Sequence, residues 1–499
     1  MEHRPPQGTF AAIDLGSNSF HMLIARVVDG EITPVDRLRE WVQLGAGLDE
    51  KNRLRPEAER RALACLQRFG QRLQDHPASA VRAVGTNALR KARNAEGFLD
   101  RARQALGHPI KIIPGSEEAR LIYLGVAHSF YDDAHRRLIV DIGGGSTECI
   151  LGTGYDVERT ASLYMGCVSF TEAYFPGGKI RPQRMKKAVI AARLEMQNIE
   201  RDFLDRPWSR AIGASGTILA IEEVLRRAGW TDRGVSREGL EKLREALLAA
   251  GQAEQVRLPG LRADRAAVLP GGVAILLAIF ESLGLEEMLT SHGALREGLL
   301  YDLVGRLSDE DVRERTIERF MERYRVDREQ AGRVDRTAQD LLGQVLEAWQ
   351  LDEAYARRNL RWAASLHEIG LAVSHSGFHK HGAYLVAHSD MAGFSLGGQQ
   401  TLSTLIRGHR RKLTPAIFEP LQPSRAQRAL RLCLLLRLAV LLNRSRTSRP
   451  LPPIRLKVRK KGLRLAFPEG WLEGHPLVQA DLEQEVRAWA ALDLHLEYR

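Results

Sequence analysis

The amino-acid sequence predicts two related α/β domains, followed by a mainly helical domain and a small α+β domain. An internal repeat indicates the first pair. Segment 10–19 (FAAIDLGSNS) is similar to segment 138–146 (LIVDIGGGS), and the aspartates of the two segments lie 127 residues apart. A repeated supersecondary unit of this kind defines the architecture before any single motif is interpreted. From about Leu307 onward, long Arg-rich and Leu-rich amphipathic segments replace the strand-like runs, which predicts helices.

Each copy of the repeat is expected to be a β-hairpin. An apolar run is broken by small turn-forming residues, and a strand-like stretch then resumes at 20–27 and at 149–151. Strand-like and helical patterns alternate in this half, as in α/β domains. The helices expected along the chain are 56–74, 97–106, 184–203, 335–349 and 425–442.

The last 50 residues or so form the small α+β domain. A proline-containing linker at 448–453 precedes an alternating stretch, 454–467, which predicts a hairpin around Lys461-Gly462. A helix is expected at 478–492. The predicted domains are therefore 1–130, 131–307, 308–447 and 448–499.

Composition argues against secretion and membrane insertion. Segment 1–10 lacks the apolar stretch of a secretory signal, and the longest apolar runs, 271–280 and 432–442, are shorter than the roughly 20 residues that span a bilayer. Both runs are expected to be buried helices. The four cysteines lie far apart without a Cys-x-x-Cys pair, which argues against a disulfide framework and a thiolate zinc site. We expect a cytoplasmic protein, with peripheral attachment to the inner membrane as an open alternative.

The net charge of +11 is unevenly distributed. Segment 401–464 contains 17 Lys or Arg residues and one acid, Glu419, so it carries +16 and leaves −5 for the rest. Such a segment can concentrate an anionic ligand and speed its arrival. Solvated helix faces with surplus arginine produce the same pattern, and the sequence does not decide between the two.

Both hairpin turns are suited to bind phosphate, because glycine and serine let backbone N–H groups approach the phosphate oxygens. The turns supply Gly144 and Gly145 as well as hydroxyl and amide donors, and a third segment, 211–217, has a similar pattern and opens a helix at Gly216. Asp14 and Asp141 end the preceding strands and could hold Mg²⁺, which favours a few carboxylates plus phosphate oxygens. The candidate donors are Ser17, Asn18, Ser19, Ser146 and Thr147.

These motifs and their order resemble the actin-like ATPase (ribonuclease H-like) superfamily, and specifically the exopolyphosphatase and guanosine pentaphosphate phosphohydrolase family. The resemblance covers nearly the whole chain. It rests on segments 14–21 (DLGSNSFH), 85–90 (GTNALR), 116–121 (SEEARL), 141–148 (DIGGGSTE), 165–169 (MGCVS) and 291–298 (SHGALREG). The resemblance implies a cleft between two actin-like domains, in which a terminal phosphate sits between the two turns.

The resemblance also implies residue roles. Glu118 resembles the general base that deprotonates the attacking water, and Arg90 resembles a residue that contacts the substrate phosphate. Asp141 and Glu148 resemble the Mg²⁺ ligands, with Asp14 as a further candidate. Without the resemblance, Glu117 and Glu118 would be interpreted as an exposed helix start and Arg90 as a surface ion-pair partner.

The C-terminal half resembles a metal-dependent phosphohydrolase domain of the His-Asp type, but incompletely. Glu368 stands where that superfamily has aspartate, and no histidine lies between His292 and His367. Because a two-metal site needs its full set of ligands, we expect a non-catalytic domain whose histidines are satisfied polar groups or basic lining, not ligands. These histidines are His375, His379, His381, His388 and His409.

The function expected from these observations is Mg²⁺-dependent, processive release of terminal phosphate from inorganic polyphosphate, with segment 401–464 gripping the polyanion. The nearest alternative is a guanosine pentaphosphate 5′-phosphohydrolase. Phosphoryl transfer from polyphosphate to ADP and a non-catalytic polyanion sensor are two further alternatives. We expect no specific nucleic-acid partner, because zinc-finger, RNA-recognition and aromatic-interleaved patterns are absent from the sequence. The resemblance further implies a homodimer.

Overall fold

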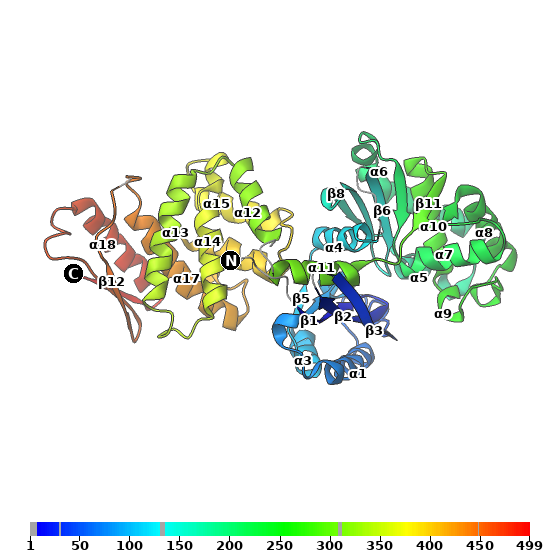
Figure 1. The fold of residues 1–499 in the computed structure, drawn as a ribbon, viewed down its shortest axis with the longest axis horizontal. Coiled ribbons are helices and arrows are strands. Elements are labelled where there is room, and N and C mark those ends of the chain that lie inside the picture. Colours follow the sequence, from blue (N-terminus) through cyan, green and yellow to red (C-terminus); the bar gives the residue numbers. More distant parts are fainter. Residues whose placement is uncertain (1–6, 29–30, 130–134, 308–311, 448) are drawn as a thin grey trace. The chain divides into compact units, whose positions relative to one another are not determined.

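The computed structural model describes residues 7–28, 31–129, 135–307, 312–447 and 449–499, which form two compact units, 1–312 and 313–499 (Figure 1). The domain boundaries predicted at 130/131, 307/308 and 447/448 fall at residues outside the described ranges. They stay a prediction.

The first unit contains two sheets that share one five-stranded topology, which confirms the predicted duplication, and the second sheet has one further strand, β10, antiparallel to β11. The first sheet has the order β3-β2-β1-β4-β5, and the second has the order β10-β11-β9-β6-β7-β8. In each, an antiparallel meander of three strands is extended by parallel strands from βα units. The strands are β1 Gly8–Leu15, β2 Ser19–Val28, β3 Glu31–Trp41, β4 Val81–Gly85, β5 Ile110–Ile112, β6 Arg136–Ile142, β7 Thr147–Thr153, β8 Asp156–Leu163, β9 Arg210–Gly213, β10 Val235–Ser236 and β11 Glu287–Thr290.

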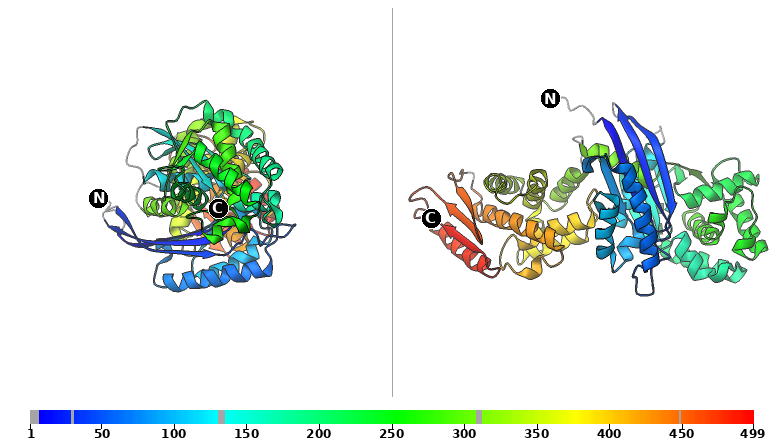
Figure 2. Two further views of the ribbon diagram at one scale, coloured as in Figure 1. Left: turned by 90° about the vertical axis from the view of Figure 1, so that its right-hand side faces the viewer. Right: turned by 90° about the horizontal axis from the view of Figure 1, so that it is seen from below.

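Helices cover both faces of the sheets. The strands carry apolar side chains on both faces, and the helices remove these side chains from water. Helices α1 and α3 pack on one face of the first sheet, as the left view of Figure 2 shows. The helices of this unit are α1 Pro56–Leu73, α2 Asn87–Lys91, α3 Ala95–Leu106, α4 Gly115–Ala127, α5 Cys167–Tyr174, α6 Pro182–Leu204, α7 Gly216–Arg227, α8 Arg237–Ala250, α9 Ala263–Ala266, α10 Leu269–Leu283 and α11 Leu295–Leu307. The apolar run 271–280 is the buried helix α10, as predicted.

Helices α4 and α11 join the two sheets. Their apolar side chains share one core with residues of both sheets, and the two helices approach each other so closely that only glycine fits. A Cβ atom on Gly298 would lie 1.7 Å from the carbonyl oxygen of Leu121, and one on Gly125 would lie 2.1 Å from that of Ala294. The backbone of α4 is therefore held against the backbone of α11.

A buried ion network reinforces this contact. Glu117 on α4 and Asp302 on α11 pair with Arg82 on β4, Arg120 on α4 and Arg306 on α11. The Nε atom of Arg120 lies 2.7 Å from a carboxylate oxygen of Glu117. Burial alone would raise the pKa of Glu117, but pairing with these arginines lowers it. The network therefore holds Glu117 ionised inside the protein.

The second unit has a helical part and a three-stranded sheet of order β12-β13-β14. Its core is continuous from the helices to the sheet. Its elements are α12 Val312–Arg323, α13 Arg328–Gly343, α14 Glu353–Leu366, α15 Phe378–His388, α16 Leu396–Gly408, α17 Pro423–Leu442, β12 Arg455–Arg459, β13 Gly462–Ala466, α18 Pro476–Ala490 and β14 His495–Tyr498. The predicted terminal hairpin and helix are confirmed.

Two local differences from the sequence prediction have physical causes. The helix expected at 335–349 begins earlier, after the Asp327 side chain accepts a hydrogen bond from Gln330 N, and ends at Gly343. Glycine is a poor helix former, and the chain continues in turns to Gln350, whose φ is 49°. Strand β14 was not predicted, because a four-residue strand that pairs in parallel with β13 has no local turn signal.

Replacing Gly298 by alanine should force α4 and α11 apart. We expect the free energy of unfolding to fall by about 1–3 kcal/mol or more, the usual cost of overpacking, in a urea titration of the full chain. The matched control is Gly97→Ala on α3, where a Cβ meets nothing within 4 Å and where we expect no loss of stability. Equal effects at the two positions would contradict a close contact between these helices.

Candidate active site

The predicted phosphate-binding turns meet at a cavity of about 300 Å³ in the first unit. The turns between β1 and β2 and between β6 and β7 line it, together with the first residues of α7 and α11. The predicted site residues that line it are Asp14, Ser17, Asn18, Ser19, Glu118, Asp141, Gly144, Gly145, Ser146 and Gly216. The two aspartates of the repeat therefore reach one cavity.

The backbone of each turn is oriented by hydrogen bonds on its carbonyl side. In the first turn, Ser17 O accepts from Gly45 N at 2.7 Å and Asn18 O accepts from Gln43 N at 2.8 Å. In the second turn, Gly143 O and Gly144 O accept from backbone amides at the start of α5. Across the described ranges, the amides of Ser17, Asn18, Gly144 and Gly145 donate to no protein acceptor. Amides left free beside a cavity form a binding site for anions.

Missing side chains let the two turns approach each other. A Cβ atom on Gly144 would lie 3.3 Å from Cβ of Ser17, and one on Gly145 would lie 2.9 Å from Oδ1 of Asn87. A Cβ on Gly166, which precedes α5, would lie 2.4 Å from the backbone of the second turn. Gly144 thus allows the second turn to lie against the first turn, Gly145 allows it to lie against Asn87 on α2, and Gly166 allows α5 to begin close to it.

Three carboxylates, Asp14, Glu118 and Asp141, line the cavity, and a fourth, Glu148, is buried beside Asp141. Burial raises the pKa of each. The pKa of Asp14 is raised to about 7, by burial first and then by the charge of Glu118. Burial and the neighbouring Glu118 likewise raise the pKa of Asp141 and of Glu148 well above the usual value. These shifts show a concentration of negative charge that favours a cation.

Glu118 lies in the first turn of α4 and is held by Arg90. The guanidinium Nη1 of Arg90 donates to Oε2 of Glu118 at 2.7 Å and to the carbonyl of Ile113 at 3.0 Å. Burial raises the pKa of Glu118, and Arg90 opposes this shift. The interpretation of Glu117 and Glu118 as an exposed helix start is wrong, because both are buried.

Three predicted site residues do not line the cavity. Thr147 is fully buried, and its hydroxyl donates to Met165 O at 2.6 Å, so it has no free donor for phosphate. Glu148 accepts from the Ser162 hydroxyl at 2.8 Å, and the bonds of Arg90 go to Glu118 and Ile113. The proposed roles of Glu148 and Arg90 therefore depend on contact with Glu118 and its neighbours, not on direct exposure to the cavity.

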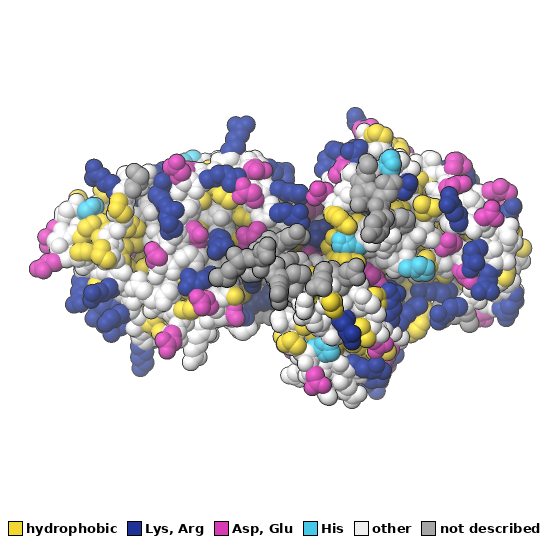
Figure 3. Space-filling view, viewed as in Figure 1, with side chains coloured by type: hydrophobic (Ala, Val, Ile, Leu, Met, Phe, Trp, Pro, Cys, Tyr) yellow, Lys and Arg dark blue, Asp and Glu magenta, His cyan; other side chains and the backbone are white. Residues whose placement is uncertain are grey.

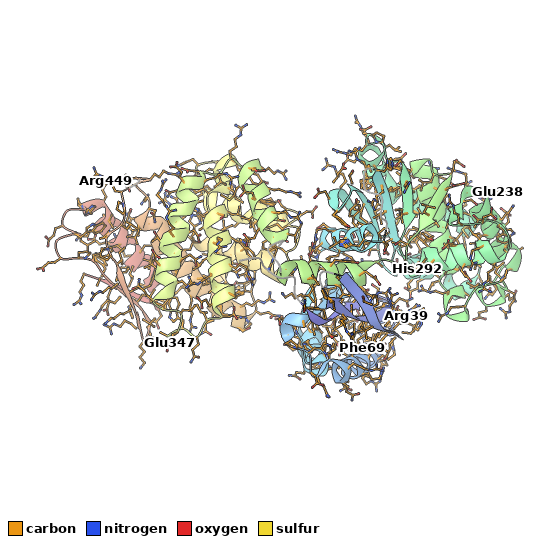
Figure 4. The ribbon with its side chains drawn as sticks, viewed as in Figure 1. Arg39, Phe69, Glu238, His292, Glu347 and Arg449 are labelled. Atoms are coloured by element: carbon orange, nitrogen blue, oxygen red, sulfur yellow. The ribbon has the colours of Figure 1, made fainter. Side chains whose placement is uncertain are left out.

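The cavity also contains basic residues that the sequence prediction missed. They are His21, Arg39, Arg265, His292 and Arg296, and Figure 4 labels Arg39 and His292 in the first unit. The guanidinium groups of Arg39 and Arg265 lie 4.8 Å and 5.5 Å from the centre of the Trp41 ring. His21 belongs to the quoted motif 14–21, and His292 and Arg296 belong to the quoted motif 291–298, although no role was predicted for them. Arg39 and Arg265 lie outside every quoted motif.

Arg265 also explains the glycine at the start of α7. A Cβ on Gly216 would lie 2.3 Å from Nη2 of Arg265. Gly216 thus lines the cavity and leaves room for a guanidinium group, in addition to the phosphate-binding role predicted for it.

The carboxylates fit a magnesium ion that is completed by the substrate. Oδ1 of Asp14 is buried and has no hydrogen-bond partner in the protein. No group of three or more His, Cys, Asp or Glu side chains in the described ranges forms a complete metal cage. Mg²⁺ is commonly held by one or two carboxylates plus phosphate oxygens and water, so an incomplete protein cage agrees with this ion.

Family models match most of the chain. The model of the Ppx/GppA phosphatase family matches residues 23–307, and the model of Ppx/GppA phosphatase, domain III, matches residues 312–486. The chain belongs to the Ppx/GppA phosphatase family. The predicted enzyme class, a hydrolase that acts on phosphoanhydride bonds, is confirmed.

Two relatives of known name align with nearly the full length. The chain is 41% identical over 480 residues to the guanosine-5′-triphosphate,3′-diphosphate pyrophosphatase of Aeromonas hydrophila, and the alignment covers 96% of each protein. It is 40% identical over 486 residues to the protein of the same name from Photobacterium profundum, with 97% of each covered. These names favour the nucleotide alternative over the first functional prediction.

Solved structures of the Ppx/GppA family confirm the predicted fold class. The Aquifex aeolicus PPX-GPPA enzyme has a TM-score of 0.51 and 28% identity, and the match covers 59% of this chain and 99% of that one. An exopolyphosphatase-like protein has a TM-score of 0.54 and 27% identity, covering 60% of this chain and 98% of that one.

Segment 401–464 of this Ppx/GppA protein is partly neutralised by folding. Arg437 is buried and pairs with Glu485, while Arg444 pairs with Asp481 and Arg446 with Asp327 and Glu368. Lys461 and Arg464 also have acidic partners outside the segment. On the face drawn in Figure 3, acidic side chains lie among the Lys and Arg side chains. The sequence charge of +16 therefore overstates the charge available to a polyanion.

Three histidines of the second unit are buried near one another. His367 and His409 each have Nδ1 within hydrogen-bond distance of a backbone carbonyl, and their Nε2 atoms have no partner in the protein. Nδ1 of His379 is also unpartnered. Nε2 of His367 lies 3.9 Å from Oε1 of Glu368. The expectation that the histidines of this domain are satisfied polar groups or basic lining, and not ligands, stays a prediction. No helix in the described ranges is long and apolar enough to cross a bilayer, and all four cysteines are buried thiols.

Acid should destabilise the protein partly through His409. Burial holds the pKa of His409 well below its usual value, so the unfolded chain binds a proton near pH 6.5 that the folded chain does not. Stability from this residue is complete above pH 6.5 and falls as the pH decreases below it.

The measurement is the free energy of urea unfolding at several pH values from 7 to 5. We expect His409→Gln to weaken the pH dependence by up to about 1 kcal/mol per pH unit, and the exposed His388→Gln to leave it unchanged. Equal slopes for wild type and His409→Gln would contradict the lowered pKa.

Proposed function

We propose that this protein hydrolyses the terminal 5′ phosphoanhydride bond of guanosine pentaphosphate. The supporting observation is the alignment, over 96–97% of each chain, with two proteins named guanosine-5′-triphosphate,3′-diphosphate pyrophosphatase. The first prediction, an exopolyphosphatase, is less well supported than this alternative.

The site residues have roles that suit phosphoryl transfer to water. The free amides of Ser17, Asn18, Gly144 and Gly145 bind the terminal phosphoryl oxygens, and Ser19 and Ser146 add hydroxyl groups. Asp14 and Asp141 hold Mg²⁺, which neutralises charge that develops on the phosphate oxygens. Each residue then contributes positioning and charge stabilisation instead of covalent chemistry.

Glu118 is the proposed general base. Its raised pKa lies closer to neutrality than that of an exposed glutamate, which favours acceptance of a proton from the attacking water. Arg90 orients its carboxylate, and Glu148 adds to the negative charge that attracts the metal ion. These proposed roles replace the direct phosphate contact first predicted for Arg90 and the direct Mg²⁺ ligation first predicted for Glu148.

Polyphosphate is the second candidate substrate. The favouring observations are the likeness to an exopolyphosphatase-like protein and the basic segment 401–464. The turns contact only a terminal phosphoryl group, which both substrates present. A homodimer remains part of the proposal, and sedimentation of the full chain tests it.

The substrate is tested by measuring kcat/KM for guanosine pentaphosphate and long-chain polyphosphate side by side with Mg²⁺. We expect the nucleotide to be preferred more than about tenfold, a difference of about 1.4 kcal/mol in transition-state binding. The opposite preference would support polyphosphate. ATP formation from ADP and polyphosphate would indicate phosphoryl transfer, and binding without turnover would indicate a sensor.

Glu118→Gln should lower kcat by about 10²- to 10⁴-fold, because the amide cannot accept the proton, while KM changes little. The matched control is Glu96→Gln, an exposed glutamate in the first turn of α3, which should retain full activity. Retention of more than a tenth of kcat in Glu118→Gln would remove this residue from the role of base.

A further inference from the structure

A chain of two hydrogen bonds leads from α11 to the first phosphate-binding turn. Nη1 of Arg296 lies 2.7 Å from Nδ1 of His21, and Nε2 of His21 lies 3.1 Å from Oγ of Ser19. All three residues line the cavity. His21 and Ser19 are on β2, whereas Arg296 comes from the other end of the unit, 275 residues later in sequence.

The donor in each of these bonds follows from the chemistry of the groups. A guanidinium group has only donors, so Nδ1 of His21 must accept from Arg296. A ring that accepts at Nδ1 carries its proton at Nε2, so Nε2–H of His21 donates to Oγ of Ser19. A doubly protonated ring would place two donors 2.7 Å apart, so the contact with Arg296 excludes this form of His21.

The Ser19 hydroxyl proton is thereby directed away from His21. Its oxygen already accepts one hydrogen bond, and the hydroxyl group of Ser19 makes no further hydrogen bond within the described ranges. Ser19 is 7% exposed, so few water molecules can serve as its acceptor. The free O–H of Ser19 faces the cavity in which the proposed substrate phosphate would bind.

We propose that Arg296 and His21 are positioning residues, which orient the Ser19 hydroxyl as a hydrogen-bond donor to the terminal phosphoryl group. In this series of hydrogen bonds each donor polarises the group that accepts from it, which strengthens the hydrogen bond that this group donates in turn. The positive charge of Arg296 thus strengthens the hydrogen bond from Ser19 to the phosphoryl oxygens, although His21 and Ser19 are themselves neutral. The proposal rests on the proposed phosphohydrolase function of this cavity.

A double-mutant cycle tests the relay, with kcat measured for the full chain on the better of the two substrates. We expect Ser19→Ala to lower kcat about 10- to 100-fold, the effect of one hydrogen bond to a charged group. His21→Leu should lower kcat about tenfold alone, but less than about twofold in the Ser19→Ala background, because its partner is gone.

Two variants separate positioning from a general structural effect. His21→Gln keeps an N–H donor and should recover most of the activity lost in His21→Leu. His292→Ala removes another cavity histidine, one that does not contact Ser19, and its effect should multiply with that of Ser19→Ala. Independent effects of His21→Leu and Ser19→Ala would overturn the relay, as would equal loss in His21→Gln and His21→Leu.

The protonation state of His21 is measured without turnover. In full-length protein with ¹⁵N-labelled histidine, His21→Leu identifies the ring signals, and we expect Nε2 to be protonated and Nδ1 unprotonated at neutral pH. A proton on Nδ1 would overturn the proposal. Wild-type protein that hydrolyses neither substrate would overturn the proposed function, whereas an active enzyme with independent mutational effects would overturn the relay alone.

Discussion

Burial of negative charge around one cavity is the constraint on which the rest of the site depends. Asp14, Glu118, Asp141 and Glu148 are carboxylates removed from water, and burial raises the pKa of each. Such charges are costly unless positive groups neutralise them. Arg90 pairs with Glu118, but Oδ1 of Asp14 is left without a protein partner. A divalent cation bound together with an anionic substrate would remove this cost, so the burial of the carboxylates and the chemistry of the proposed reaction favour the same ligands.

The fold holds these charges in place through backbone contacts. Glu118 is in the first turn of α4, and the contacts at Gly125 and Gly298 fix that helix against α11. The neighbouring residue, Glu117, belongs to the buried ion network that joins α4, α11 and β4. Adjacent glutamates therefore have different tasks: one anchors the helix and the other faces the cavity. An anchored helix can hold the buried carboxylate of Glu118, which pairs with Arg90, at the cavity without local unfolding.

Features that repeat locally could be predicted from the sequence, and features that depend on distant contacts could not. The two hairpins, their aspartates and the glycine turns follow from a repeat, and the structure brings them to one cavity. Thr147 looked like a phosphate donor because it follows the turn, but the strand register points its hydroxyl to Met165. The cavity arginines Arg39 and Arg265 come from separate elements outside every quoted motif, and no sequence spacing connects them to the turns, whereas Arg296 lies in the quoted motif 291–298.

The two halves of the duplication have diverged at one equivalent position. In the first hairpin Asp14 is paired across the strands with His21, and in the second Asp141 is paired with Glu148. Side chains paired in this way lie on the same face of a sheet. A carboxylate beside Asp141 adds negative charge where a cation is proposed, whereas a neutral imidazole beside Asp14 adds a hydrogen-bond donor for Ser19. The duplicated backbone thus supplies two similar turns, each with an aspartate for the proposed metal ion, and the histidine of the first hairpin adds a hydrogen-bond donor to Ser19 where the second hairpin has a carboxylate.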